Sequence, residues 1–72
     1  MNTNTKSFPK TIYSKGAIIK AIDDYKKLAK IDLSENLEYY ICDFADCVID
    51  PERIIKEFGN YLIEIMNSSK VG

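Results

Sequence analysis

The chain has 72 residues, of which 46% are hydrophobic, and its ten Lys and Arg residues almost balance eleven Asp and Glu residues. A chain of this length forms one small domain with little room for an enclosed pocket, and its lack of His excludes Ser-His-Asp and Cys-His catalytic centres and His-containing zinc sites. The net charge of −1 argues against a dedicated nucleic-acid-binding protein, and we predict a protein with no catalytic residues, no metal site and no cofactor.

The N-terminal residues are predicted to form a flexible segment followed by an edge strand. Residues 1–7 are polar, and Pro9 has no main-chain N–H, which confines the next segment to the edge of a sheet. We expect the first strand over residues 8–13, because its last three residues favour extended structure, namely Thr11, Ile12 and Tyr13.

A helix is predicted next, over about residues 15–29. Ser14 is suited to cap its N-terminus. The apolar residues that follow recur at the spacing of one helical face, at Ile18, Ala21, Ile22, Tyr25, Leu28 and Ala29. The lysines of this helix are expected to form a solvated face, with contact to phosphate groups as the weaker alternative.

Two further strands are predicted to form a hairpin. Ile31 and Leu33 alternate with polar residues, as in a short strand with one buried face, and residues 34–36 are turn formers. Residues 37–44 are apolar on both faces, which suits a central strand. One face of this strand carries Tyr40, Cys42 and Phe44, and the other carries Leu37, Tyr39 and Ile41.

The second helix has a strong start signal in the sequence. Asp50 can cap it, Pro51 suits its first position, and Glu52 places an acid in its first turn. We expect it to continue to about residue 67. Gly59 lies inside it at a cost of about 1 kcal/mol relative to Ala, which predicts that another part of the chain packs closely at this position.

The order of these elements predicts a two-layer α+β fold of the βαββα type. A right-handed crossover makes the first two strands parallel, and the hairpin makes the third antiparallel to the second. With the two-faced strand in the middle, the three-stranded sheet has the order 1-3-2 and both helices cover one face. We expect a single domain over residues 8–67 and a flexible C-terminus over residues 68–72.

The other face of this sheet is predicted to be open. It would expose Leu37, Tyr39 and Ile41, and contiguous apolar surface of this kind usually marks an interaction site. Partial cover by the N-terminal segment is the alternative.

The longest apolar runs fall far short of the roughly 20 residues of a membrane span, and the first six residues lack the apolar core of a signal peptide. We therefore expect a cytoplasmic protein that does not contact the membrane. Cys42 and Cys47 are too few for a zinc site or a disulfide framework. In a reducing compartment they are expected to be buried small hydrophobes, with a redox role as the alternative.

Two blocks of the chain resemble HxsD proteins, the small subunits of the His-Xaa-Ser peptide-modification systems. The first block is similar to the opening of these proteins and comprises Ile12-Tyr13-Ser14, Ala17-Ile18, Lys20-Ala21, Tyr25 and residues 29–33. The second resembles a block near their C-terminal helix and comprises Glu57-Phe58, Asn60 and Leu62. The resemblance covers about residues 8–66.

This resemblance implies a non-catalytic accessory protein in the maturation of a ribosomally synthesised peptide. Its partners would be the precursor peptide, through its leader, and a radical SAM (S-adenosylmethionine) maturase. The maturase would hold the iron-sulfur cluster, because two cysteines cannot form a four-thiolate site. The protein would capture an extended peptide at an edge of its sheet by strand addition.

The residues expected to bind the peptide or partner lie at two sheet edges and on the open face. The edge candidates are Thr11, Ile12, Tyr13, Ile31, Asp32 and Leu33, and the open-face candidates are Tyr39 and Ile41. A homodimeric assembly module that pairs through the open face, without peptide binding, is the main alternative. A small nucleic-acid-binding regulator is the weaker one.

Overall fold

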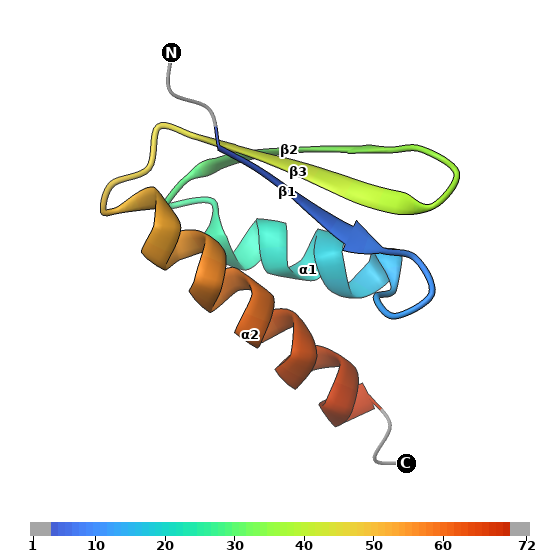
Figure 1. The fold of residues 1–72 in the computed structure, drawn as a ribbon. Helices are drawn as coiled ribbons and strands as arrows, with labels where there is room; N and C mark the ends of the chain where they lie inside the picture. The colour runs from blue at the N-terminus through green and yellow to red at the C-terminus, as the bar shows by residue number, and fades with distance from the viewer. Residues whose placement is uncertain (1–3, 70–72) are drawn as a thin grey trace.

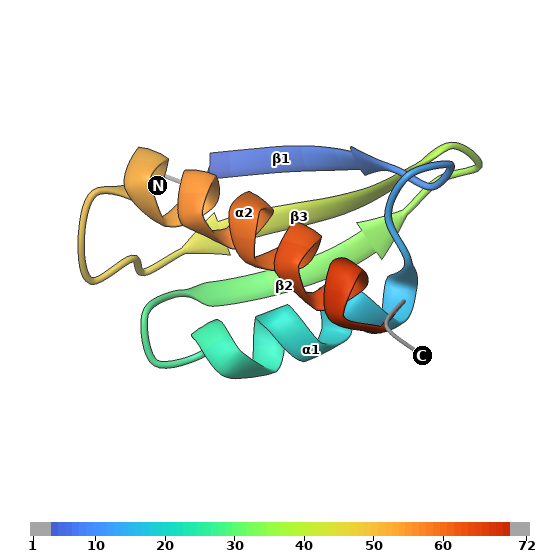
Figure 2. The same cartoon turned by 90° about the horizontal axis from the view of Figure 1, so that it is seen from below.

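A computed structural model of the chain describes residues 4–69, in which two helices lie on one face of a three-stranded sheet (Figure 1). The elements in chain order are β1 (Asn4–Pro9), α1 (Lys15–Tyr25), β2 (Lys30–Glu35), β3 (Tyr39–Ala45) and α2 (Pro51–Ser69). Seen from below, α2 crosses the helix-facing side of the sheet obliquely (Figure 2). The predicted α+β fold is confirmed.

The sheet has the order β1-β3-β2, as predicted. Both outer strands are antiparallel to β3 and therefore parallel to each other. The register places Ile41 between Ser7 of β1 and Ser34 of β2, and it places Asp43 between Thr5 and Asp32. Cross-strand partners share a face of the sheet, so this register decides which residues face the helices.

The hydrophobic core fills the space between the sheet and the two helices. Phe58 of α2 is fully buried at its centre. Its ring lies 5.2 Å from that of Phe44, 5.4 Å from that of Tyr25 and 5.9 Å from that of Phe8, measured between ring centroids. The buried hydrophobic residues are Phe8, Ala17, Ile18, Ala21, Ala29, Cys42, Phe44, Ile54, Phe58 and Leu62. Within residues 4–69, neither helix is long and apolar enough to cross a membrane.

The first strand begins and ends earlier than the sequence predicts. Residues 4–7, predicted to be flexible, pair with β3, and residues 1–3 lie outside the described part. The predicted strand residues 11–13 form a turn instead, because the carbonyl oxygen of Pro9 accepts the N–H groups of Ile12 and Tyr13 at 3.1 and 3.0 Å. The burial of Phe8 outweighs the intrinsic β-propensity of the three residues that follow Lys10.

The first helix ends at Tyr25, four residues before its predicted end. Ser14 caps it as predicted, since its Oγ accepts the N–H of Ala17 at 3.2 Å. After the helix, the N–H groups of Leu28 and Ala29 both donate to the carbonyl of Tyr25, at 2.8 and 3.1 Å. In this turn the side chains of Leu28 and Ala29 still face the core. The two residues therefore match the apolar spacing of a helix in the sequence although they lie beyond its end.

The hairpin turn lies later in the chain than predicted, and β2 continues through residue 35. Asn36 organises the turn: its N–H donates to the carbonyl of Tyr39 at 3.0 Å, and its Oδ1 accepts the N–H groups of Glu38 and Tyr39. Leu37 therefore occupies the hairpin tip, 95% exposed, and not the open face of the sheet as predicted.

The second helix begins at Pro51 as predicted and continues to Ser69. Residues 68 and 69, predicted to belong to a flexible C-terminus, lie in this helix, and residues 70–72 lie outside the described part. The prediction of close packing at Gly59 is wrong. A Cβ atom built on Gly59 would meet no atom within 4 Å outside its own helix backbone and chain neighbours.

Candidate functional site

The open face of the sheet is largely polar. Its side chains follow from the register, with Thr5, Asp43 and Asp32 in one row and Ser7, Ile41 and Ser34 in the next. The hydroxyl of Thr5 donates to Oδ1 of Asp43 at 2.7 Å. The apolar side chains that β1 and β3 place on this face are those of Pro9, Tyr39 and the half-buried Ile41 near the hairpin and that of the half-buried Ala45 at the other end.

The outer edges of β1 and β2 each present main-chain groups away from β3. Lys10 N–H donates to the carbonyl of Glu38 at 2.9 Å, and hydrogen-bonded pairs alternate along an antiparallel ladder. In β1 the residues Asn4, Lys6 and Phe8 therefore bond to β3, while Thr5 and Ser7 direct their N–H and C=O groups outward. The main-chain groups of Pro9 also point away from β3, so its lack of an N–H removes no hydrogen bond between the two strands.

The same alternation identifies the free groups of the β2 edge. Asn36 and Tyr39 form a hydrogen-bonded pair at the hairpin, so Lys30, Asp32 and Ser34 bond to β3. The outward main-chain groups of β2 belong to Ile31, Leu33 and Glu35.

A groove borders the β1 edge on the helix side of the sheet. It has a volume of about 420 Å³ and is lined by Lys6, Tyr13, Glu52, Ile55, Lys56 and Gly59. The ring of Tyr13 packs edge-on against that of Phe8 with 5.1 Å between centroids. Tyr13, Ile55 and the bare main chain at Gly59 give the groove an apolar lining, and three charged side chains complete it.

Two lysines of this groove have no acidic partner in the described part of the chain. Within residues 4–69, no carboxylate lies within 4.0 Å of the ammonium group of Lys6 or Lys56. Glu52, from the same groove, likewise forms no ion pair with residues 4–69. The groove therefore carries one net positive charge and two cations free to meet an anionic group.

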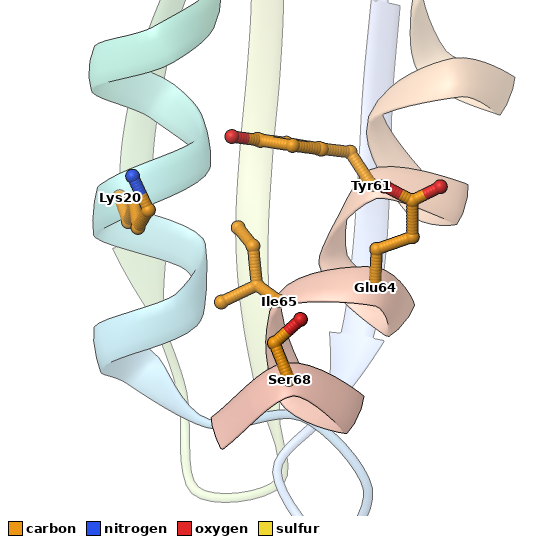
Figure 3. Close-up of a pocket in the computed structure, with 5 residues that line it drawn as sticks. All are labelled: Lys20, Tyr61, Glu64, Ile65 and Ser68. Atoms are coloured by element: carbon orange, nitrogen blue, oxygen red, sulfur yellow. The ribbon is translucent and has the colours of Figure 1, made fainter. Parts of the chain in front are cut away.

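A second groove of about 440 Å³ lies between the helices and is lined by Lys20, Tyr61, Glu64, Ile65 and Ser68 (Figure 3). Tyr61 reaches from α2 toward α1, where its hydroxyl donates to Oδ2 of Asp24 at 2.5 Å. Lys20 Nζ lies 3.2 Å from the same oxygen. The bonds from Tyr61 and Lys20 hold the pKa of Asp24 below its ordinary value, and Asp24 raises the pKa of Tyr61.

This cluster is a structural link between α1 and α2. Its carboxylate already accepts two hydrogen bonds, and the raised pKa of the Tyr61 hydroxyl keeps that group protonated. Neither group is poised as a base near neutral pH.

A second ionic cluster joins the ends of β1 and β2 to the start of α1. Glu35 contacts Lys10 Nζ at 2.7 Å and Lys15 Nζ at 3.0 Å through its two oxygens. Lys10 Nζ also lies 5.1 Å from the centroid of the Tyr40 ring. Hydrogen bonds from both lysines hold the pKa of Glu35 below its ordinary value. Lys15 is therefore paired with Glu35, and Lys20 is paired with Asp24.

The cysteines are free thiols in different environments. Cys42 is fully buried, as predicted, and burial raises its pKa to about 11. A thiol that stays protonated is neither a nucleophile nor a metal ligand at neutral pH. Cys47 is half-buried. Within residues 4–69, no three His, Cys, Asp or Glu side chains converge in a group that could hold a metal ion.

The predicted site residues of β2 and β3 lie on opposite faces of the sheet. Tyr39 and Ile41 share the open face with Asp32, whereas Ile31 and Leu33 are half-buried on the helix side of β2. Ile31, Asp32 and Leu33 form an edge strand, as predicted.

The predicted edge at residues 11–13 is wrong, because these residues form a turn. Thr11 and Ile12 are exposed there, and Tyr13 lines the β1 groove. Lys6, Ile55 and Lys56 also line this groove and were not predicted from the sequence. The only signal for this groove in the sequence is the glycine inside the second helix.

Comparison of the chain with protein-family models, with curated proteins and with solved structures found no match. The geometry of the two sheet edges and the β1 groove is therefore the basis for a functional proposal.

Proposed function

We propose that the chain is a non-catalytic peptide-binding protein that takes up an extended segment of another polypeptide as a fourth strand beside β1. The observation that carries this proposal is the coincidence of outward main-chain groups at Thr5 and Ser7 with the groove along the same edge. In strand addition, main-chain hydrogen bonds supply affinity and pockets for alternate side chains supply selectivity. The β1 edge offers both elements.

The resemblance to HxsD proteins supports one identity for the bound segment. By that resemblance, the peptide is the leader of a ribosomally synthesised precursor in the cytoplasm, and the chemistry belongs to a radical SAM maturase on which this protein docks. The protein itself contributes binding only.

The homodimeric alternative has less support from the surface chemistry. Face-to-face pairing would bury Asp32 and Asp43, and the neighbouring Lys30 supplies a single cation on that face, so desolvation of the two carboxylates is costly. Nucleic-acid binding through α1 has less support too, because the ammonium groups of Lys15, Lys20 and Lys26 lie within 3.4 Å of carboxylates.

A pair of substitutions at Ser7 tests the proposed function. Ser7→Pro removes an outward N–H that β3 does not use and adds a ring at the edge, while Ser7→Ala removes only the hydroxyl. A lost hydrogen bond of about 1–1.5 kcal/mol, together with the ring, weakens binding about tenfold or more. We expect Ser7→Pro to weaken binding of the synthetic leader peptide by that factor and Ser7→Ala to change it less than about twofold.

The readout is a titration of ¹⁵N-labelled protein with the leader of the precursor encoded beside its gene, followed by NMR. Amide shifts are expected at Thr5 and Ser7. Shifts at Ile31 and Leu33 instead, with equal binding by both Ser7 variants, would place the peptide on the β2 edge and refute the β1 assignment. A dimer that shows no response to the peptide would refute peptide capture in favour of assembly.

A further inference from the structure

We infer that the β1 groove selects a bulky apolar side chain above Gly59 and an acidic side chain between Lys6 and Lys56, two positions apart in the bound strand. This inference rests on the proposed function and names the class of segment that the edge accepts. It follows from the side-chain alternation of an added strand, from the space at Gly59 and from the charges in the groove.

The alternation fixes which ligand side chains enter the groove. An added strand bonds to the outward groups of Thr5 and Ser7, so the ligand residue between these bonds lies opposite Lys6. Lys6 and Phe8 share the helix-facing side of β1 with the buried Cys42 and the ring of Tyr40. The ligand residues opposite Lys6 and Phe8 therefore point to the same side, into the groove, and are two positions apart in the ligand.

The position opposite Phe8 is suited to an apolar side chain. Tyr13, which packs against Phe8, lines the groove together with Ile55 and Gly59. Glycine is unfavourable inside a helix, yet an added Cβ at residue 59 would meet no atom within 4 Å. Packing within the chain therefore does not require this glycine, and the missing side chain leaves room for that of a ligand.

The position opposite Lys6 is suited to an acid. Lys6 and Lys56 line the same groove and have no carboxylate partner within residues 4–69, while Glu52 supplies the only negative charge among the lining residues. A ligand carboxylate opposite Lys6 would form the ion pair that the two lysines lack within residues 4–69.

The same charge argues against a second copy of this chain as the occupant. Antiparallel pairing of two β1 strands through Thr5 and Ser7 would place Lys6 of one copy directly opposite Lys6 of the other. Like charges in direct opposition destabilise a strand pair. Edge strands commonly carry a lysine that disfavours pairing with a second copy of the same strand. The occupant that fits is a different polypeptide with an acid at this position.

Four nonapeptides test the assignment. One has alternating Thr and Ser with Glu and Phe two positions apart at its centre. Two controls replace its Glu by Lys or its Phe by Ser, and a fourth peptide carries Thr and Ser only. Titrations followed by NMR are expected to shift the amides of Thr5, Ser7 and Gly59 with the first peptide and to give at least tenfold weaker binding for the other three.

Two protein variants provide matched controls. Gly59→Leu fills the groove and is expected to weaken binding of the Phe-containing peptides at least tenfold, while circular dichroism confirms that the variant is folded. Lys6→Glu is expected to reverse the preference, so that the Lys-containing peptide binds more tightly than the Glu-containing one. A reversal cannot result from misfolding.

The outcomes separate this inference from the proposed function. If Ser7→Pro weakens binding but Gly59→Leu and Lys6→Glu leave the peptide preference unchanged, the groove is not the selective element and the inference is overturned while peptide capture stands. If none of the four peptides shifts any amide at millimolar concentration and the leader peptide also fails to bind, both are overturned.

Discussion

Replacement of Gly59 by Ala is expected to stabilise the protein, although the position lies in the middle of the longest helix. The added Cβ meets no atom within 4 Å, and the backbone there is not in the left-handed region. The change therefore removes the helix-interior cost of glycine, about 0.5–1 kcal/mol, without adding a clash. For a domain of this size that free energy raises the unfolding temperature by about 2–8 °C.

Urea denaturation followed by circular dichroism at 222 nm measures this effect. With an m-value of about 1 kcal/mol/M, the midpoint is expected to rise by about 0.5–1 M at constant m. Gly16→Ala is the matched control, because a Cβ at Gly16 also meets open space. Gly16 lies in the first turn of α1, where the propensity gain is smaller. A lower midpoint for Gly59→Ala would show that residue 59 is closely packed and would refute the reasoning.

Three further predictions concern the core, the ionic clusters and the thiols. Phe58→Ala is expected to cost about 3–5 kcal/mol of a total stability of about 4–11 kcal/mol for 72 residues. Thermal unfolding should show a midpoint lowered by about 12–40 °C, and a loss below 1 kcal/mol would contradict the central position of this ring. The pKa of Glu35 is lowered in the folded state, so its stabilising contribution is complete above the ordinary value of 4.5 and is lost as pH falls through the lowered value. Glu35→Gln should therefore flatten the dependence of the free energy of unfolding on pH in that acidic window. Cys42, buried and with a pKa near 11, should react with Ellman's reagent in native protein at pH 8 far more slowly than Cys47, and equal rates would show that the core opens readily.

The sheet order was predictable because the pattern of apolar residues in β3 indicates a central strand. Residues 40, 42 and 44 on one side and residues 39 and 41 on the other are apolar or aromatic, and that pattern suits a central strand. The hairpin and the crossover rule then determine the remaining order. The start of α2 was predictable for a similar reason, since Asp50 and Pro51 are local signals that do not depend on tertiary contacts.

The position of β1 and the candidate groove could not be predicted in this way. The sequence around β1 offers β-branched residues after Pro9 and polar residues before it, and the strand forms in the polar part because pairing with β3 buries Phe8. The groove joins Lys6 to Ile55 and Gly59, about fifty positions away. Their proximity depends on the angle of α2 across the sheet, which has no local signature.

The antiparallel pairing of β1 with β3 has a consequence for synthesis on the ribosome. Thr5 and its partner Asp43 are separated by 38 positions, so at about 5–20 residues per second the first strand waits about 2–8 s for its partner to be translated. During that interval β1 is a nascent chain without a sheet. Its opening residues, Asn4, Thr5, Lys6 and Ser7, are polar and carry a charge, which makes them poor nuclei for aggregation. β1, which is translated before its partner strand, therefore has a sequence that can remain exposed to solvent without promoting aggregation.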